Sequence, residues 1–116
     1  MIQIKNHKVF ERLSMIPLHY KLFSILYMLE ELVPDPVITS AYRSNEEGVH
    51  GANPCRGLDI RSSHLPDTVC QQIEKKINDE WIYDNNRPDK KVCLWHKVGE
   101  GAYHFHLQVH PNTRRR

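Results

Sequence analysis

The chain has 116 residues, of which 40% are hydrophobic and 26% charged, and its formal net charge is +2 with histidine neutral. These values predict one soluble globular domain, residues 1–116, and the charge is too small to indicate nucleic-acid binding by itself. The most apolar stretch, Leu18 to Val33, contains Lys21, Glu30 and Glu31 and so does not predict a membrane span.

The chain contains three cysteines, Cys55, Cys70 and Cys93. An odd number without a closely spaced pair argues against a disulfide framework and favours synthesis in a reducing compartment. The first residues lack an apolar run and a small-residue cleavage site, so we expect no secretory signal. A site of action outside the cytoplasm would then require release or transport by another component.

The first half of the chain predicts a helix followed by a strand. Apolar residues recur at helical spacing from Leu18 to Val33, and Pro34 and Pro36 end the helix. Residues 37–42 are rich in β-branched side chains, which favour a strand.

A loop and a short strand come next. Residues 45–56 contain glycine and proline breakers and predict a loop. Residues 57–61 predict a strand in which Leu58 and Ile60 face one way and Asp59 faces the other.

The second half predicts a helix from about Asp67 to Trp81 and then two strands, Lys91 to Val98 and Ala102 to His110. The short connection between these strands favours a hairpin. The element order predicts an α+β domain with two main helices and a small antiparallel sheet. The terminal Arg114–Arg116 is expected to be a disordered, solvated tail, with weak attraction to anionic polymers as the alternative.

The last strand carries the most informative pair of residues, His104 and His106. Strand side chains alternate, so both histidines should project from one face, about 7 Å apart. Imidazole is the commonest metal ligand in proteins. His50 and Asp59 upstream would supply the missing nitrogen and oxygen, and His50, Asp59 and His106 match the three protein ligands of a catalytic zinc.

Such a site predicts hydrolytic chemistry. Zinc lowers the pKa of a bound water toward about 7 and polarises a substrate carbonyl. A base then accepts the water proton, and a cation stabilises the developing oxyanion. His104 could be the base or a donor to the intermediate, and the guanidinium of Arg43 could be the cation.

Three motifs in this order resemble a known family: Ser40-Ala41-Tyr42-Arg43-Ser44, then His50 with Gly57-Leu58-Asp59, then His104-Phe105-His106. The resemblance is to the zinc D-alanyl-D-alanine carboxypeptidase and L-alanyl-D-glutamate endopeptidase family, and within it to the His-x-His subgroup. These peptidoglycan peptidases share a small α+β fold with the hedgehog signalling domain. The similarity covers roughly residues 37–110.

The resemblance implies a role for each matching residue. His50, Asp59 and His106 would bind Zn2+, and His104 would assist catalysis. Arg43 would meet a carbonyl or carboxylate of the substrate.

The sequence departs from the family pattern in the loop before Asp59. Eight residues separate His50 from Asp59, which is longer than the common spacing. Cys55 lies within this loop, and a thiolate is a good zinc ligand. We take Cys55 first as a structural or supporting residue and second as a rival ligand.

A second departure concerns the general base. Many relatives carry an acidic residue three positions before the final ligand, where this chain has Tyr103. The base therefore remains open among His104, Glu100 and a residue that the sequence does not identify.

The candidate zinc site predicts a hydrolase, and the resemblance implies a zinc metallopeptidase that cleaves stem peptides or cross-links of peptidoglycan. Its size and the expected lack of a signal suit a bacteriophage endolysin or a virion-associated wall hydrolase, made in the cytoplasm and acting on the cell wall. We expect a monomer unless it is part of a virion, with a peptide as partner and no nucleic acid. The alternative is a catalytically inactive, zinc-stabilised binding module of the same fold, and a weaker one is nucleic-acid binding through the basic tail.

Overall fold

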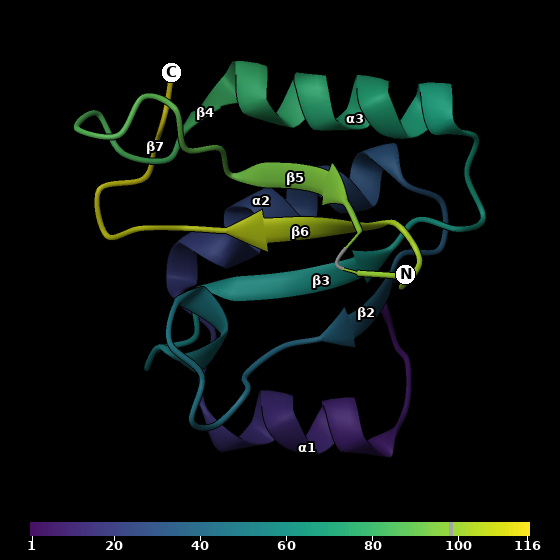
Figure 1. Ribbon diagram of the computed structural model, residues 1–116, viewed down its shortest axis with the longest axis vertical. Helices are drawn as coiled ribbons and strands as arrows, with labels where there is room; N and C mark the ends of the chain where they lie inside the picture. Colours follow the sequence, from purple (N-terminus) through teal and green to yellow (C-terminus); the bar gives the residue numbers. More distant parts are fainter. Residues whose placement is uncertain (98) are drawn as a thin grey trace.

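A computed structural model of the chain describes residues 1–97 and 99–116. Figure 1 shows the arrangement of the helices and strands. In chain order they are β1 (Gln3–Ile4), α1 (His7–Met15), α2 (Tyr20–Leu32), β2 (Val37–Ser40), the 3-10 helix η1 (Val49–Gly51), β3 (Gly57–Arg61), α3 (Asp67–Glu80), β4 (Trp81–Ile82), β5 (Cys93–His96), β6 (His104–Gln108) and β7 (Arg114–Arg115).

A five-stranded sheet with the order β1-β2-β3-β6-β5 forms the centre of the fold (Figure 1). Its neighbouring strands are antiparallel, except that β1 and β2 are parallel. A second sheet pairs β4 with β7. The predicted α+β class and the hairpin of β5 with β6 are therefore confirmed, whereas the sheet, which we predicted to be antiparallel, also contains the parallel pair of β1 and β2.

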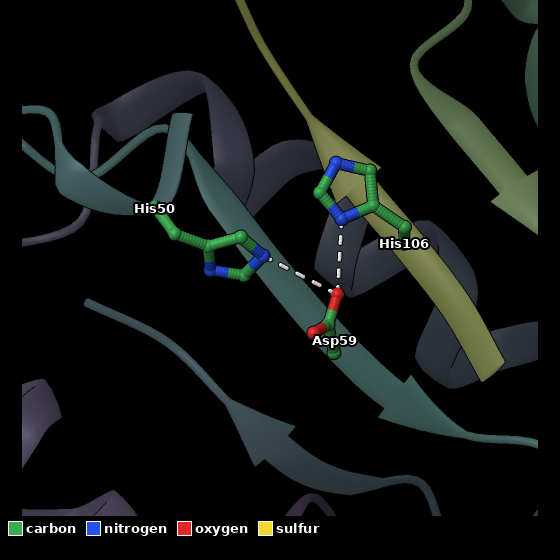
Figure 2. Close-up of side chains that lie close together, drawn as sticks. All are labelled: His50, Asp59 and His106. Carbon is green, nitrogen blue, oxygen red and sulfur yellow. Dashed lines mark hydrogen bonds and ion pairs between the residues drawn. The ribbon is translucent and has the colours of Figure 1, made fainter. Parts of the chain in front are cut away.

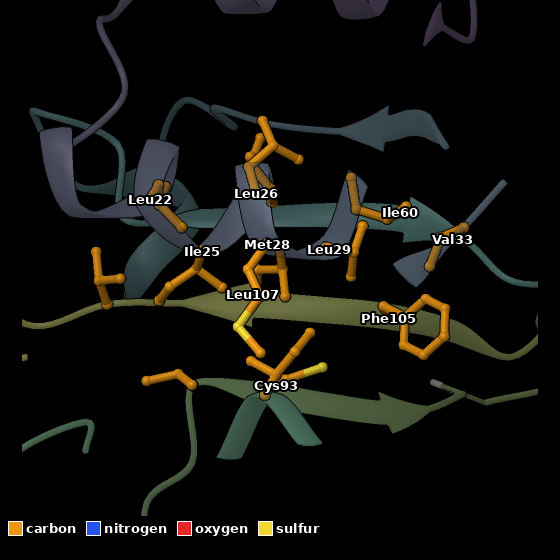
Figure 3. Close-up of a cluster of buried hydrophobic side chains, with 14 of the residues drawn as sticks. Leu22, Ile25, Leu26, Met28, Leu29, Val33, Ile60, Cys93, Phe105 and Leu107 are labelled. Carbon is orange, nitrogen blue, oxygen red and sulfur yellow. The ribbon is translucent and has the colours of Figure 1, made fainter. Parts of the chain in front are cut away.

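Helix α2 packs against one face of this sheet, and Figure 3 shows the apolar side chains between them. Each fully buried aliphatic or aromatic side chain contributes roughly 1.5–3 kcal/mol relative to exposure. The fully buried residues at the centre of this layer are Leu22, Ile25 and Leu29 from α2 and Ile60, Phe105 and Leu107 from the strands. This packing fixes which face of each strand is turned toward the core.

The face of the sheet away from α2 carries the polar residues of β3 and β6. In β6 burial alternates along the strand, so that His104 and His106 lie on this second face, as predicted. Asp59 of β3 is paired in register with His106. Two of the candidate site residues are thus direct cross-strand neighbours, although 46 positions lie between them in the sequence.

The two predicted helices are present as α2 and α3, but the chain contains a third, α1, that we did not predict. Its first turn is capped by the side chain of Asn6, which accepts a hydrogen bond from the backbone N–H of Val9. Val9 is buried and Leu13 packs against the core from the same face of α1, but this apolar pattern extends over nine residues, fewer than a helical period needs to be evident in a sequence. None of the helices in the described part of the chain has the length and apolar character that crossing a membrane requires.

The last two strands of the large sheet are shorter than predicted. Strand β5 ends at His96 and β6 begins at His104, so the connection between them is longer than the expected tight turn. Val98, which we placed in the first of these strands, lies outside the described residues.

The prediction of a disordered basic tail is wrong. Arg114 and Arg115 form β7, which pairs with β4. The guanidinium of Arg115 lies 2.9 Å from a carboxylate oxygen of Glu80 and 5.2 Å from the ring centroid of Trp81. Backbone pairing and these side-chain contacts order a segment whose charge alone suggested a solvated chain.

Candidate metal centre

The candidate site is a shallow hollow of about 340 Å³ on the sheet face away from α2. It is lined by Arg43, His50, Asp59, His96, His104 and His106. The structure therefore brings together every residue of the predicted metal set, the predicted catalytic histidine and the predicted arginine. It also adds His96, to which the sequence gave us no reason to assign a role.

His50 is held on η1 with its ring turned into the site. Its Nδ1 lies 2.7 Å from the carbonyl oxygen of Ala41, to which it donates a hydrogen bond. The His50 carbonyl in turn accepts from the backbone N–H of Arg43, at 2.8 Å. The contact through Nδ1 leaves Nε2 of a neutral His50 as a bare lone pair that faces the site.

The Nε2 atom of His50 is buried and has no hydrogen-bond partner among the described residues. It lies 3.4 Å from Oδ1 of Asp59, a contact that a dashed line marks in Figure 2. Two acceptors that face each other at this distance require a cation, either a proton on the imidazole or a metal ion. An unpartnered buried nitrogen beside a carboxylate therefore fits a metal ligand.

His106 is oriented in the same manner. Its Nε2 lies 3.2 Å from Oε1 of Gln108, whose amide nitrogen donates to the Lys91 carbonyl at 2.7 Å. Because Gln108 is held in this orientation, Nε2 of His106 is the donor of that contact, and Nδ1 is left to face Asp59 at 2.9 Å. Metal-binding histidines are commonly fixed by such a partner on the far side of the ring.

Asp59 is the centre of the cluster. Its Oδ2 accepts from Arg43 at 2.9 Å, while Oδ1 faces His106, His50 and, at 3.6 Å, Nε2 of His104. Burial by itself would raise the pKa of Asp59. The imidazoles of His106 and His50 beside it and the charge of His104 outweigh burial and hold the pKa of this carboxyl well below its usual range.

The geometry of His50, Asp59 and His106 suits a metal ion. Their three ligand atoms all lie within 4.8 Å of one another. Ligand atoms around a tetrahedral ion with bonds of about 2.0–2.1 Å are about 3.3 Å apart. The two distances to Asp59 Oδ1, 2.9 and 3.4 Å, lie on either side of that value. The group could therefore hold a metal ion with little movement.

Arg43 makes more protein contacts than we predicted. Its Nε donates to Ser40 Oγ at 3.0 Å, and Nη1 lies 3.3 Å from Glu46. With Nη2 on Asp59, the guanidinium fixes the carboxylate and leaves Oδ1 for the metal position. The side chain is still 43% exposed, so a substrate can reach it.

His96 is the site residue that the sequence analysis missed. It lies directly opposite His104 in the β5–β6 pair, and its ring centroid is 5.1 Å from that of His104 and 5.7 Å from that of His106. Burial first, and then the charges of these two histidines, lower the pKa of His96. The sequence predicted the β5–β6 hairpin, but only the register of these two strands places His96 opposite His104.

The structure does not bring the other candidates into the hollow. Glu100 is exposed in the turn before β6, and Tyr103 is 45% exposed with its ring 4.5 Å from that of Trp95. Cys55 is buried, and its thiol donates to the Gly57 carbonyl at 3.3 Å. Burial raises the pKa of the Cys55 thiol, and its sulfur is not part of the ligand group.

No family model, curated protein or solved structure matches the chain. The chemistry of the site must therefore follow from its side chains. Two imidazoles and a carboxylate could hold a metal ion, and an arginine and two further histidines surround them.

Proposed function

We propose that the protein is a zinc-dependent peptidoglycan peptidase that hydrolyses peptide bonds of stem peptides or cross-links, on a hedgehog-type α+β fold. The observation that carries the proposal is the buried, unpartnered Nε2 of His50 beside Asp59 and His106. The order of the three sequence motifs supports the same assignment. A bacteriophage endolysin or a virion-associated wall hydrolase is the biological role that we infer.

The ligands of the zinc ion would be Nε2 of His50, Oδ1 of Asp59 and Nδ1 of His106. A set of two imidazoles and one carboxylate suits zinc, and three protein ligands leave one coordination position open. The bound ion would supply Lewis-acid chemistry for amide hydrolysis. Arg43 keeps Asp59 in place by holding Oδ2.

His104 is the residue to which we assign proton transfer. It lines the hollow on the same strand face as His106 but is not one of the three ligands. Its side chain is 21% exposed, so it can meet a substrate. In this role His104 accepts a proton during attack on the carbonyl and returns it to the leaving amine.

The test is hydrolysis of purified muropeptides by the zinc-loaded protein, with new amino termini quantified with and without a chelator. We expect His50→Ala, Asp59→Ala and His106→Ala to lose both bound zinc and activity. His104→Ala should keep zinc but lose about 10²–10⁴ in rate. Full activity in the ligand variants would refute the mechanism.

His64→Ala is the matched control, because His64 is exposed and lies outside the hollow. This variant should hydrolyse muropeptides as the wild type does.

A zinc-stabilised binding module without catalysis is the second candidate. It is favoured by one observation. Asp59 is the single carboxylate among the described residues that line the hollow, so no second carboxylate is present there to act as the general base. Stoichiometric zinc without hydrolysis of any muropeptide would select this candidate.

A further inference from the structure

A second hollow adjoins the metal centre and shares Arg43 with it. It has a volume of about 500 Å³ and lies between α1 and the segment that follows β2. Its cationic lining residues are Lys5, Lys8, Arg12 and Arg43, and we call this hollow the basic groove.

The positive charge of the basic groove is largely uncompensated. Glu46 is the one acidic residue of its described lining, and it is paired with Arg43 at 3.3 Å. No carboxylate of the described residues lies within 4.0 Å of the charged nitrogens of Lys5, Lys8 or Arg12. Arg12 donates one long hydrogen bond among residues 1–97 and 99–116, 3.3 Å to the hydroxyl of Ser44.

The positions of two of these charges destabilise helix α1. Lys8 and Arg12 are four positions apart on α1 and therefore share a face, where like charges destabilise a helix. The acidic residue of α1, Glu11, pairs with His7 instead. An anion bound in the groove would offset this repulsion.

We propose that the basic groove binds a free carboxylate of the peptide substrate while the scissile bond lies at the metal centre. This inference rests on the proposed function. Arg43 connects the two regions, because its guanidinium contacts Asp59 on one side and lines the groove on the other. Arg12 presents a planar fork that suits a carboxylate, and Lys5 and Lys8 add positive charge.

The carboxylate could come from the C-terminus of the peptide or from a glutamyl residue within it. The experiment therefore uses four synthetic stem peptides of one sequence: both carboxylates free, either one amidated, or both amidated. Equilibrium binding is measured by calorimetry on the full chain treated with a chelator, and kcat and KM are measured on the zinc-loaded protein.

We expect amidation of one of the two carboxylates to weaken binding and raise KM about tenfold, with kcat little changed. Arg12→Gln and Lys8→Gln should weaken binding of the peptide that carries this carboxylate and leave binding of its amidated form unchanged. Arg114→Gln, a change on β7 outside the groove, should have no effect.

Equal binding of all four peptides would overturn the proposal, and so would an equal loss of affinity for free and amidated peptides in Arg12→Gln. Carboxylate-dependent binding without hydrolysis would uphold the groove and refute the peptidase. Hydrolysis at the same rate for free and amidated peptides would uphold the peptidase and refute the groove.

Discussion

Each imidazole of the candidate metal-binding group is oriented by an oxygen atom on the far side of its ring. The Ala41 carbonyl holds His50, and the side-chain oxygen of Gln108 holds His106. Gln108 is itself fixed by the Lys91 carbonyl. These contacts select the nitrogen that faces Asp59, so the atoms that could bind a metal ion are already arranged around one position.

Removal of one such contact should weaken metal binding without unfolding the protein. We expect Gln108→Ala to reduce zinc affinity about 10–100-fold, because the ring of His106 loses its orienting partner. Competition with a chromophoric chelator measures the affinity. Gln71→Ala, an exposed change on α3, is the control, and equal affinity of the two variants would show that Gln108 does not position His106.

The approach of η1 to β3 sets the position of His50 relative to Asp59. Gly57 begins β3 beneath η1, and a Cβ at this position would lie 2.6 Å from Cγ2 of Val49 and 3.4 Å from Cδ2 of His50. The first distance is shorter than any tolerable contact, and the branched side chain of Val49 has little freedom to move away. The absence of a side chain at Gly57 therefore allows η1 to bring His50 close to Asp59.

Gly57→Ala should push η1 away from β3. We expect a loss of about 1–3 kcal/mol in the free energy of unfolding together with weaker zinc binding. Val49→Ala in the same chain removes the clashing methyl groups, so the double variant should recover most of both losses. Denaturant unfolding and zinc titration of the wild type, Gly57→Ala and the double variant measure both quantities. An unchanged free energy of unfolding and an unchanged zinc affinity in Gly57→Ala would show that Gly57 does not set the position of η1.

At the scale of the whole molecule, the sequence predicted local structure better than long-range pairing. Alternation within β3 and β6 correctly assigned Asp59 and His106 to polar strand faces. That these strands are neighbours, with Asp59 opposite His106, depends on the order of the sheet, which no spacing reveals.

Two of the features that the sequence did not predict have the same origin. His96 joins the site through the register of β5 with β6, and Arg115 is ordered by a strand more than thirty positions earlier in the chain. Both depend on a partner strand rather than on neighbouring residues. Helix α1 was not predicted for a different reason, because its apolar pattern extends over nine residues, which is shorter than the window in which a helical period is evident.

The most direct measurement is anomalous X-ray diffraction at the zinc edge from crystals of the zinc-loaded protein. We expect one zinc ion bound by His50, Asp59 and His106 at about 2.0–2.1 Å, with no fourth ligand from the protein. Zinc at another position, or a fourth protein ligand such as Cys55 closing the coordination sphere, would contradict it.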